Sequence, residues 1–459
     1  MKRFPSTQLS VFFFALLLTL ACKQEPVPTP TPDPDPSPTY TQYGQPLTAL
    51  PAADDWVLYE VNLRAFSPAG NLQGVTARID EIAALGVNVL WLMPIYPIGA
   101  IRSVNSPYSI ADYKAVNPEL GDLEDLRALS DAAHARGMVL VLDWVANHTA
   151  WDHPWIDTPS WYTQDNAGNI IHPAGTNWQD VADLNFSNPN MRQAMIDAMR
   201  YWVLEANVDG YRCDAADFVP ADFWRQAIDS LRDIPGRHLL MLAEGARNDH
   251  HAVGFDLTFG WAQYQAMKDV YGGQPATRLF DTHTAQYSKI PAGKHELRFI
   301  TNHDESAWDA TPPQLFDGLD GAFAAAVANT FLGGVPLIYG SQEVGQITTL
   351  SFFTRQPIDW SRNPVYLADY QRLMSIYTGE AAARTRDFQA FRHNDVLCFT
   401  KTTGSEVLAC LVNLRGDSVY YPTPAALRQA AWTDTWTSTD RSLDSIQAMG
   451  PYDFLLLRQ

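Results

Sequence analysis

Four short apolar runs in this sequence each end in a carboxylic acid, and they follow one another in a fixed order. The four acids are Asp143, Asp214, Glu244 and Asp304. A His or Arg lies beside three of them. One apolar run that ends in Asp is a common accident. Four of them, separated by helix-like segments, predict acids gathered at one end of a parallel β-barrel, because the carboxyl ends of its strands share one face.

Apolar runs alternate with helical stretches from Trp56 onward, which is the pattern of an α/β chain folded as a (β/α)8 TIM barrel. We expect this barrel to occupy residues 50–380. Helices are expected at 75–85, 123–136 and 367–377. The eight expected strands are 57–62, 87–92, 138–142, 208–213, 239–243, 255–258, 297–301 and 336–339.

Two segments depart from this alternation. Residues 149–188, after the third strand, are long for a barrel loop and predict a small inserted subdomain. Residues 381–459 combine short β runs with turn residues, which predicts a C-terminal antiparallel β domain. In that domain Cys398 and Cys410 lie on two strands of a hairpin, and both a disulfide and a pair of buried thiols fit the sequence.

The N-terminus has the features of an export signal. In residues 1–21 a basic start precedes an apolar run too short to span a membrane. Cys22 follows Ala21 as in the lipobox of bacterial lipoproteins, although Thr19 also suits an ordinary signal peptidase. Residues 22–49 then form a Pro-rich linker. We expect an exported protein with a membrane anchor on Cys22, at the outer membrane or cell surface, or otherwise a periplasmic or secreted one.

Composition excludes some partners. The formal net charge of -19 over 459 residues disfavours nucleic acid. The sequence has no Cys/His spacing typical of a metal site and no Gly-rich phosphate loop, so no organic cofactor is expected.

Several carboxylates that face one pocket have pKa values driven apart, because they cannot all be ionised together. One can then act as a nucleophile and another as an acid. Retaining glycoside hydrolysis needs that division between two carboxyl groups about 5–5.5 Å apart.

The four acid-containing segments resemble the signature regions of glycoside hydrolase family 13, the α-amylase family. The resemblance implies that Asp214 is the nucleophile, Glu244 the general acid/base and Asp304 a residue that binds sugar hydroxyls. It also implies structural support from Asp143. The residues expected to position or bind the substrate are Tyr108, His148, Arg212 and His303.

The same resemblance implies a structural calcium ion between barrel and subdomain, with Asn147 and Asp183 as ligands. A hydrogen-bonded Asn147 without metal is the alternative. The sequence departs from the family at Asp217-Phe218, where many starch-cleaving members carry Lys-His, so a different preference for the leaving part of the substrate is expected.

One or more of Trp151, Trp155, Trp161 and Trp178 is expected to contact substrate, and the others to form the core of the subdomain. The resulting hypothesis is a retaining hydrolase of α-1,4-glucosidic bonds in starch or maltooligosaccharides. Alternatives are an α-glucan transglycosylase, a cyclomaltodextrinase-type enzyme and, in a different class, a catalytically dead glycan-binding protein.

Overall fold

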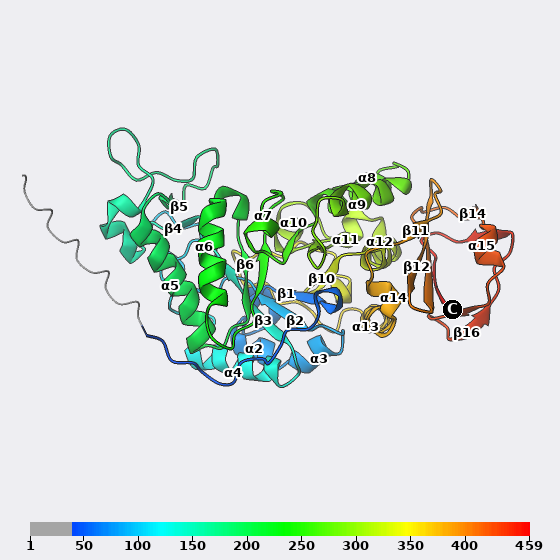
Figure 1. Cartoon of the computed structure of the whole chain (residues 1–459), viewed down its shortest axis with the longest axis horizontal. Helices are drawn as coiled ribbons and strands as arrows, with labels where there is room; N and C mark the ends of the chain where they lie inside the picture. The colour runs from blue at the N-terminus through cyan, green and yellow to red at the C-terminus, as the bar shows by residue number, and fades with distance from the viewer. Residues whose placement is uncertain (1–38) are drawn as a thin grey trace, which may run out of the picture. The chain divides into compact units, whose positions relative to one another are not determined.

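The computed structural model describes residues 39–459, and within them eight parallel strands close into a barrel (Figure 1). Around the barrel the strands follow the order β1-β10-β9-β8-β7-β6-β3-β2. The predicted (β/α)8 fold is therefore confirmed. The strands are β1 (Leu58–Val61), β2 (Val89–Leu92), β3 (Val139–Trp144), β6 (Gly210–Cys213), β7 (Leu240–Ala243), β8 (Leu257–Phe259), β9 (His295–Arg298) and β10 (Val335–Tyr339).

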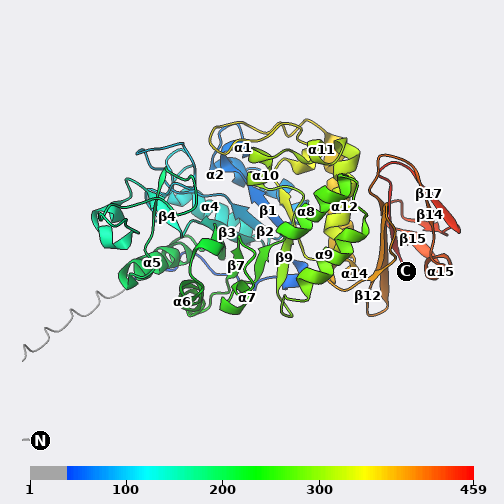
Figure 2. The same ribbon diagram turned by 90° about the horizontal axis from the view of Figure 1, so that it is seen from above.

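Helices surround the barrel, as the view from above shows (Figure 2). The longer ones pack an apolar face on the strands, which removes that face from water. They are α4 (Leu123–His134), α5 (Pro189–Glu205), α6 (Ala221–Arg232), α8 (Trp261–Tyr271), α9 (Thr277–Tyr287), α12 (Gly318–Leu332) and α13 (Pro364–Gly379). Short helices are α1 (Leu63–Phe66), α2 (Leu72–Thr76), α3 (Ile79–Ala83), α7 (His250–Val253), α10 (His303–Trp308), α11 (Pro312–Leu315), α14 (Ala381–Arg384) and α15 (Ala425–Arg428).

The prediction of one helix at 75–85 is wrong, because the chain forms the two short helices α2 and α3 there. The side chain of Asn71 accepts a hydrogen bond from the Gly74 amide and starts α2 early. Arg78 leaves helical geometry (φ -113°, ψ 12°). Its guanidinium lies 4.5 Å from the ring centre of Trp360, and this tertiary contact accompanies the break.

After β3 the chain forms the inserted subdomain. Two antiparallel strands, β4 (His148–Ala150) and β5 (Val181–Asp183), hold it together, with the 3-10 helices η2 (Pro154–Asp157) and η3 (Pro159–Trp161) between them. Trp155 packs 5.1 Å from Trp161 and 5.2 Å from Tyr113 between ring centres, so these tryptophans form the subdomain core.

The C-terminal residues form antiparallel sheets, as predicted. The six-stranded sheet has the order β11-β12-β13-β18-β15-β16, and a second sheet pairs β14 with β17. These strands are β11 (Gln389–Ala390), β12 (Val396–Thr403), β13 (Glu406–Asn413), β14 (Val419–Pro422), β15 (Trp432–Asp434), β16 (Thr439–Arg441), β17 (Ile446–Met449) and β18 (Phe454–Arg458). One face of the larger sheet belongs to the same apolar core as the barrel.

Cys398 and Cys410 do not form the disulfide that the sequence left open. Both are free and buried. Cys398 pairs with Leu411, whereas Cys410 pairs with Phe399, a one-residue offset. Because side chains alternate between the two faces of a strand, the two thiols point into different cores.

The end of the predicted linker is part of the folded unit. The Tyr43 amide donates to the Leu204 carbonyl at 2.7 Å, and the Thr41 amide donates to Glu205 Oε1 at 2.8 Å. Residues 1–38, including the predicted signal, Cys22 and most of the linker, lie outside the described residues. Among residues 39–459, no helix is long and apolar enough to cross a membrane.

Candidate active site

One buried guanidinium joins three of the predicted site acids. Arg212 lies on β6 between β3 and β7, and it is fully buried. Its Nη1 atom lies 2.8 Å from Asp143 Oδ1 and 3.0 Å from Asp214 Oδ1. Its Nη2 atom lies 3.0 Å from Glu244 Oε2, at ion-pair distance but outside hydrogen-bond alignment. The parallel register of neighbouring strands therefore gathers the acids, as the sequence predicts.

Burial raises the pKa values of these acids above their ordinary values. It raises the pKa of Asp214 to about 7 against the opposing effect of Arg212, and the charge of Asp143 adds to the rise. Burial likewise raises the pKa of Glu244 to about 7, with Asp214 and Asp304 adding to it. Asp143, also buried, has a pKa of about 6. Since only Asp214 of the first two accepts an aligned hydrogen bond from Arg212, the geometry favours ionised Asp214 and protonated Glu244.

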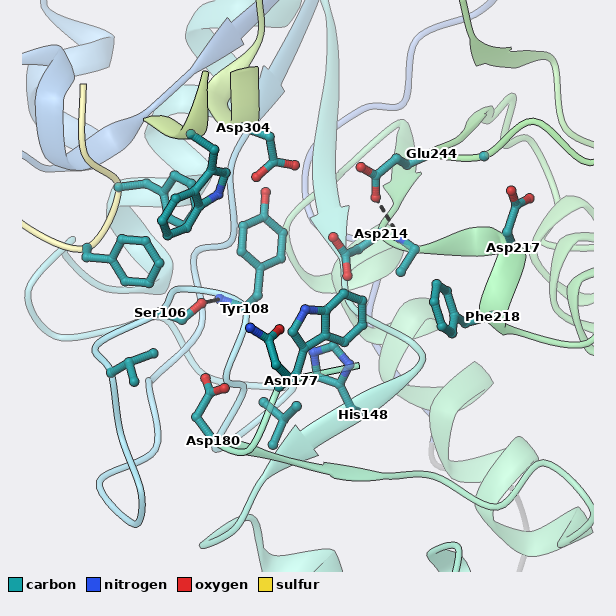
Figure 3. Close-up of a pocket in the computed structure, with 18 of the residues that line it drawn as sticks. Ser106, Tyr108, His148, Asn177, Asp180, Asp214, Asp217, Phe218, Glu244 and Asp304 are labelled. Atoms are coloured by element: carbon teal, nitrogen blue, oxygen red, sulfur yellow. Dashed lines mark hydrogen bonds between the residues drawn. The ribbon is translucent and has the colours of Figure 1, made fainter. Parts of the chain in front are cut away.

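The backbone after Asp214 positions Glu244. Ala215 adopts a left-handed conformation (φ 43°, ψ 43°), which is strained for a residue with a Cβ. In this conformation its amide donates a 2.7 Å hydrogen bond to Glu244 Oε2, drawn as a dashed line in Figure 3. The local strain thus fixes the two catalytic candidates relative to each other.

Tyr108 lies beside these acids, and its hydroxyl is held by a hydrogen bond with the buried His303. Its hydroxyl lies 2.6 Å from His303 Nε2 and donates to Asp143 Oδ2 at 3.2 Å. The other ring nitrogen of His303 bonds to buried Glu60. Burial by itself would lower the pKa of His303, but the carboxylates of Asp304 and Glu60 outweigh it and raise the value to about 9. His303 is therefore an imidazolium at neutral pH.

A cavity of about 670 Å³ opens above these groups. Five of the residues predicted to act in catalysis or in substrate positioning line it, namely Tyr108, His148, Asp214, Glu244 and Asp304 (Figure 3). Arg212, His303 and Asp143 do not line it. They lie behind the lining residues and are at most 1% exposed. Arg212 holds Asp214 by a hydrogen bond, and His303 lies behind Tyr108, so both position residues that line the cavity.

Sequence reasoning missed several other lining residues. These are Asn177, Asp180, Trp261, Trp308, Phe352 and Phe353. Trp308 lies four residues after Asp304 on α10, a helical spacing that could have revealed it. The Phe pair belongs to a loop without periodic pattern. Of the four tryptophans in the inserted subdomain, Trp178 lines the cavity.

Asp217 and Phe218, where the sequence departs from the family, differ in their roles. The Asp217 carboxylate accepts hydrogen bonds from the Ala246 and Arg247 amides and lies 2.6 Å from His250 Nε2. Burial raises its pKa, but these bonds outweigh that effect and leave the pKa lowered. Asp217 thus fastens the loop after β7. Phe218 is exposed at the cavity rim, 5.5 Å from Trp178 between ring centres.

The predicted calcium ligands do not face one another. The Leu184 amide donates to the Asn147 carbonyl, and the next pair in the ladder is His148 with Asp183. Asn147 lies in the bend before β4, one position outside the pair that Asp183 forms with His148. No cluster of three His, Cys, Asp or Glu that could hold a metal occurs among residues 39–459.

The fold and site together define a glycoside hydrolase on a (β/α)8 barrel. The catalytic domain of α-amylases matches residues 51–390. The chain belongs to the α-amylase family.

Known proteins agree with this assignment. The α-amylase MalA of Haloarcula japonica is 30% identical over 321 residues, which cover 66% of this chain and 46% of that protein. The chain thus spans about half the length of that relative. Probable oligo-1,6-glucosidase 2 of Bacillus subtilis is 32% identical, with 66% of each chain covered. The crystal structure of an α-amylase from Lactobacillus plantarum superimposes with a TM-score of 0.79 and 29% identity, covering 89% of this chain and 99% of that one.

Proposed function

We propose that this protein is a retaining α-glucan hydrolase that cleaves α-1,4-glucosidic bonds in starch or maltooligosaccharides. The observation that carries the proposal is the Arg212 fork, which brings Asp214 and Glu244 together at the base of one cavity. A close carboxylate pair is the arrangement that retention requires. The names of relatives, α-amylase and oligo-1,6-glucosidase, support an α-glucan as the substrate.

The geometry divides the work between two acids. An Asp214 carboxylate oxygen attacks the anomeric carbon, while Glu244 gives its proton to the leaving glycosidic oxygen. The same Glu244 then removes a proton from water, which attacks the anomeric carbon and releases Asp214. Tyr108 and Asp304 line the cavity beside Asp214, which supports a role for both in binding the sugar ring.

A transglycosylase or cyclomaltodextrinase-type enzyme uses the same first step and differs in the group that attacks the ester. Two relatives support these alternatives by their names. They are trehalose synthase/amylase of Mycobacterium tuberculosis and intracellular maltogenic amylase of Bacillus subtilis. A dead glycan-binding scaffold is disfavoured because Asp214, Glu244 and Asp304 all face the cavity.

A product time course tests the proposal. The protein is incubated with soluble starch, maltoheptaose and cyclodextrin, beside an Asp214→Asn control. Short maltooligosaccharides formed only by the wild type support a hydrolase with Asp214 as nucleophile. Products longer than the maltoheptaose supplied indicate a transglycosylase. No product from any substrate, with maltoheptaose binding retained, indicates the binding protein.

We also propose that the chain is exported and lipidated on Cys22, which would tether it to the outer membrane or cell surface. The support is the signal-like segment with Cys22 after Ala21. Expression of the full chain with a labelled fatty acid, beside Cys22→Ser, checks this. Label in the wild type alone supports the anchor, whereas equal label or none contradicts it.

Structural calcium at Asn147 and Asp183 stays a prediction. Thermal melting with EDTA and with added Ca²⁺ decides it. A calcium-dependent melting temperature that is lost in Asn147→Ala supports the site. Equal melting in both conditions contradicts it.

A further inference from the structure

A hydrogen-bonded seam joins two loops that line one side of the catalytic cavity. The buried Arg64 Nη1 donates to the carbonyl oxygens of Asn105 and Phe352, both at 2.9 Å. Asn105 Oδ1 accepts from Arg64 Nη2 at 3.1 Å, and Asn105 Nδ2 donates to the Phe353 carbonyl. The seam therefore joins the loop after β2 to the loop after β10.

Aromatic side chains form a wall on the cavity side of this seam. Phe352 and Phe353 stack with ring centres 4.5 Å apart, and Trp308 packs 5.4 Å from Phe353. Phe352 also packs 6.0 Å from Tyr108 and 5.6 Å from His303. A sugar seated over Tyr108 consequently meets this aromatic wall of Trp308, Phe352 and Phe353 next.

The position of the acid gives the direction of the substrate chain. Glu244 protonates the leaving oxygen, so the reducing-end part of the substrate departs on the Glu244 side. Asp217 and Phe218 lie on that side, whereas Tyr108 and Ser106 lie across the cavity (Figure 3). Ser106 follows Asn105 of the seam, so the wall stands where the non-reducing part of the substrate would continue.

We propose that the enzyme is exo-acting: it binds the non-reducing end of an α-glucan chain against the aromatic wall and releases a short product from that end. The inference rests on the proposed hydrolase function and names its mode of attack. The chain beyond the cleavage point leaves past the exposed Phe218.

Two matched substrates test the proposal. One is p-nitrophenyl α-maltopentaoside with a free non-reducing end, and the other carries a 4,6-O-ethylidene block on that end. An exo-acting enzyme cleaves the free substrate and turns over the blocked one at least about 100-fold more slowly, because the block clashes with the wall. Similar rates on both would overturn the inference. Cleavage of neither would overturn the proposed hydrolase function itself.

An Asn105→Gly variant tests whether the seam is the cause. Asn105 has φ 63°, which Gly adopts freely, so the loop backbone is retained while both side-chain bonds are lost. We expect the ratio of blocked to free cleavage to rise at least about fivefold as the wall loosens. Asn169→Gly, in the inserted subdomain where Asn169 bonds Asp165, is the control and keeps the wild-type ratio. An unchanged ratio in Asn105→Gly would refute the role of the seam.

Discussion

Arg212→Lys tests whether one guanidinium organises the catalytic acids. Arg212 Nη1 donates hydrogen bonds to Asp143 and Asp214, and Nη2 lies 3.0 Å from Glu244. The shorter side chain of Lys ends in a single nitrogen and cannot hold all three carboxylates as this planar fork does. Hydrogen bonds to charged groups contribute about 1.5–3 kcal/mol each. Loss of both corresponds to about 3–6 kcal/mol, so kcat/KM is expected to fall by about 10²–10⁴-fold.

The pH profile separates this effect from simple destabilisation. The charge of Arg212 lowers the pKa of Asp214, and its displacement raises that pKa. Because the nucleophile must be ionised, the acid limb of kcat/KM is expected to move to higher pH. The assay follows nitrophenyl maltopentaoside cleavage from about pH 4 to 9.

The matched control for Arg212→Lys is Arg237→Lys, because Arg237 is a buried arginine between α6 and β7 that bonds to residues just before β6. It pairs with Asp209 at 3.3 Å. We expect a lower melting temperature in that variant with an unchanged acid limb. An Arg212→Lys enzyme within tenfold of wild-type kcat/KM, with the wild-type acid limb, would refute the reasoning.

Three further predictions follow from the site and the C-terminal sheet. Burial raises the pKa of Glu244 to about 7, so the folding stability that its protonated form contributes is lost as the pH rises through 7. Glu244→Gln should therefore abolish turnover yet raise the melting temperature by roughly 2–4 °C at pH 8 and by less at pH 5. Equal shifts at both pH values in scanning calorimetry would contradict this. Phe218→Ala should lower kcat/KM on maltoheptaose about 3–10-fold, because the sugar loses stacking on the Phe218 ring. The control is Tyr420→Ala, which removes an exposed aromatic of the C-terminal sheets and should leave kcat/KM unchanged. Equal losses in both variants would argue against contact between Phe218 and the substrate. Cys398 and Cys410 should react with a thiol reagent only after unfolding, and a melting temperature that falls on reduction would reveal a disulfide instead.

Local patterns in the sequence predicted the barrel and its acids. Strand and helix periodicities depend on neighbouring residues, and in a parallel barrel every strand end reaches the same face. Asp214 and Glu244 follow two neighbouring parallel strands, so the alternation of strands and helices predicts that they approach one another. The family assignment rests on these same segments and is confirmed by the match over residues 51–390.

Other features depend on contacts that no local pattern encodes. The break at Arg78 accompanies packing on Trp360. The register of the hairpin sets the one-residue offset between Cys398 and Cys410. His303 lies behind Tyr108 because its ring bonds to Glu60.

The sequence by itself determined which acids reach the catalytic face, because Asp214 and Glu244 directly follow strands β6 and β7, and Asp304 lies in the segment after β9. Only the tertiary structure decided how that face is closed. Asn105 and Phe353 are 248 residues apart, and no periodicity links two irregular loops across that separation. They meet because barrel closure sets β1 between β2 and β10, so the loops that follow β2 and β10 approach one another and the buried Arg64 after β1 bonds to both.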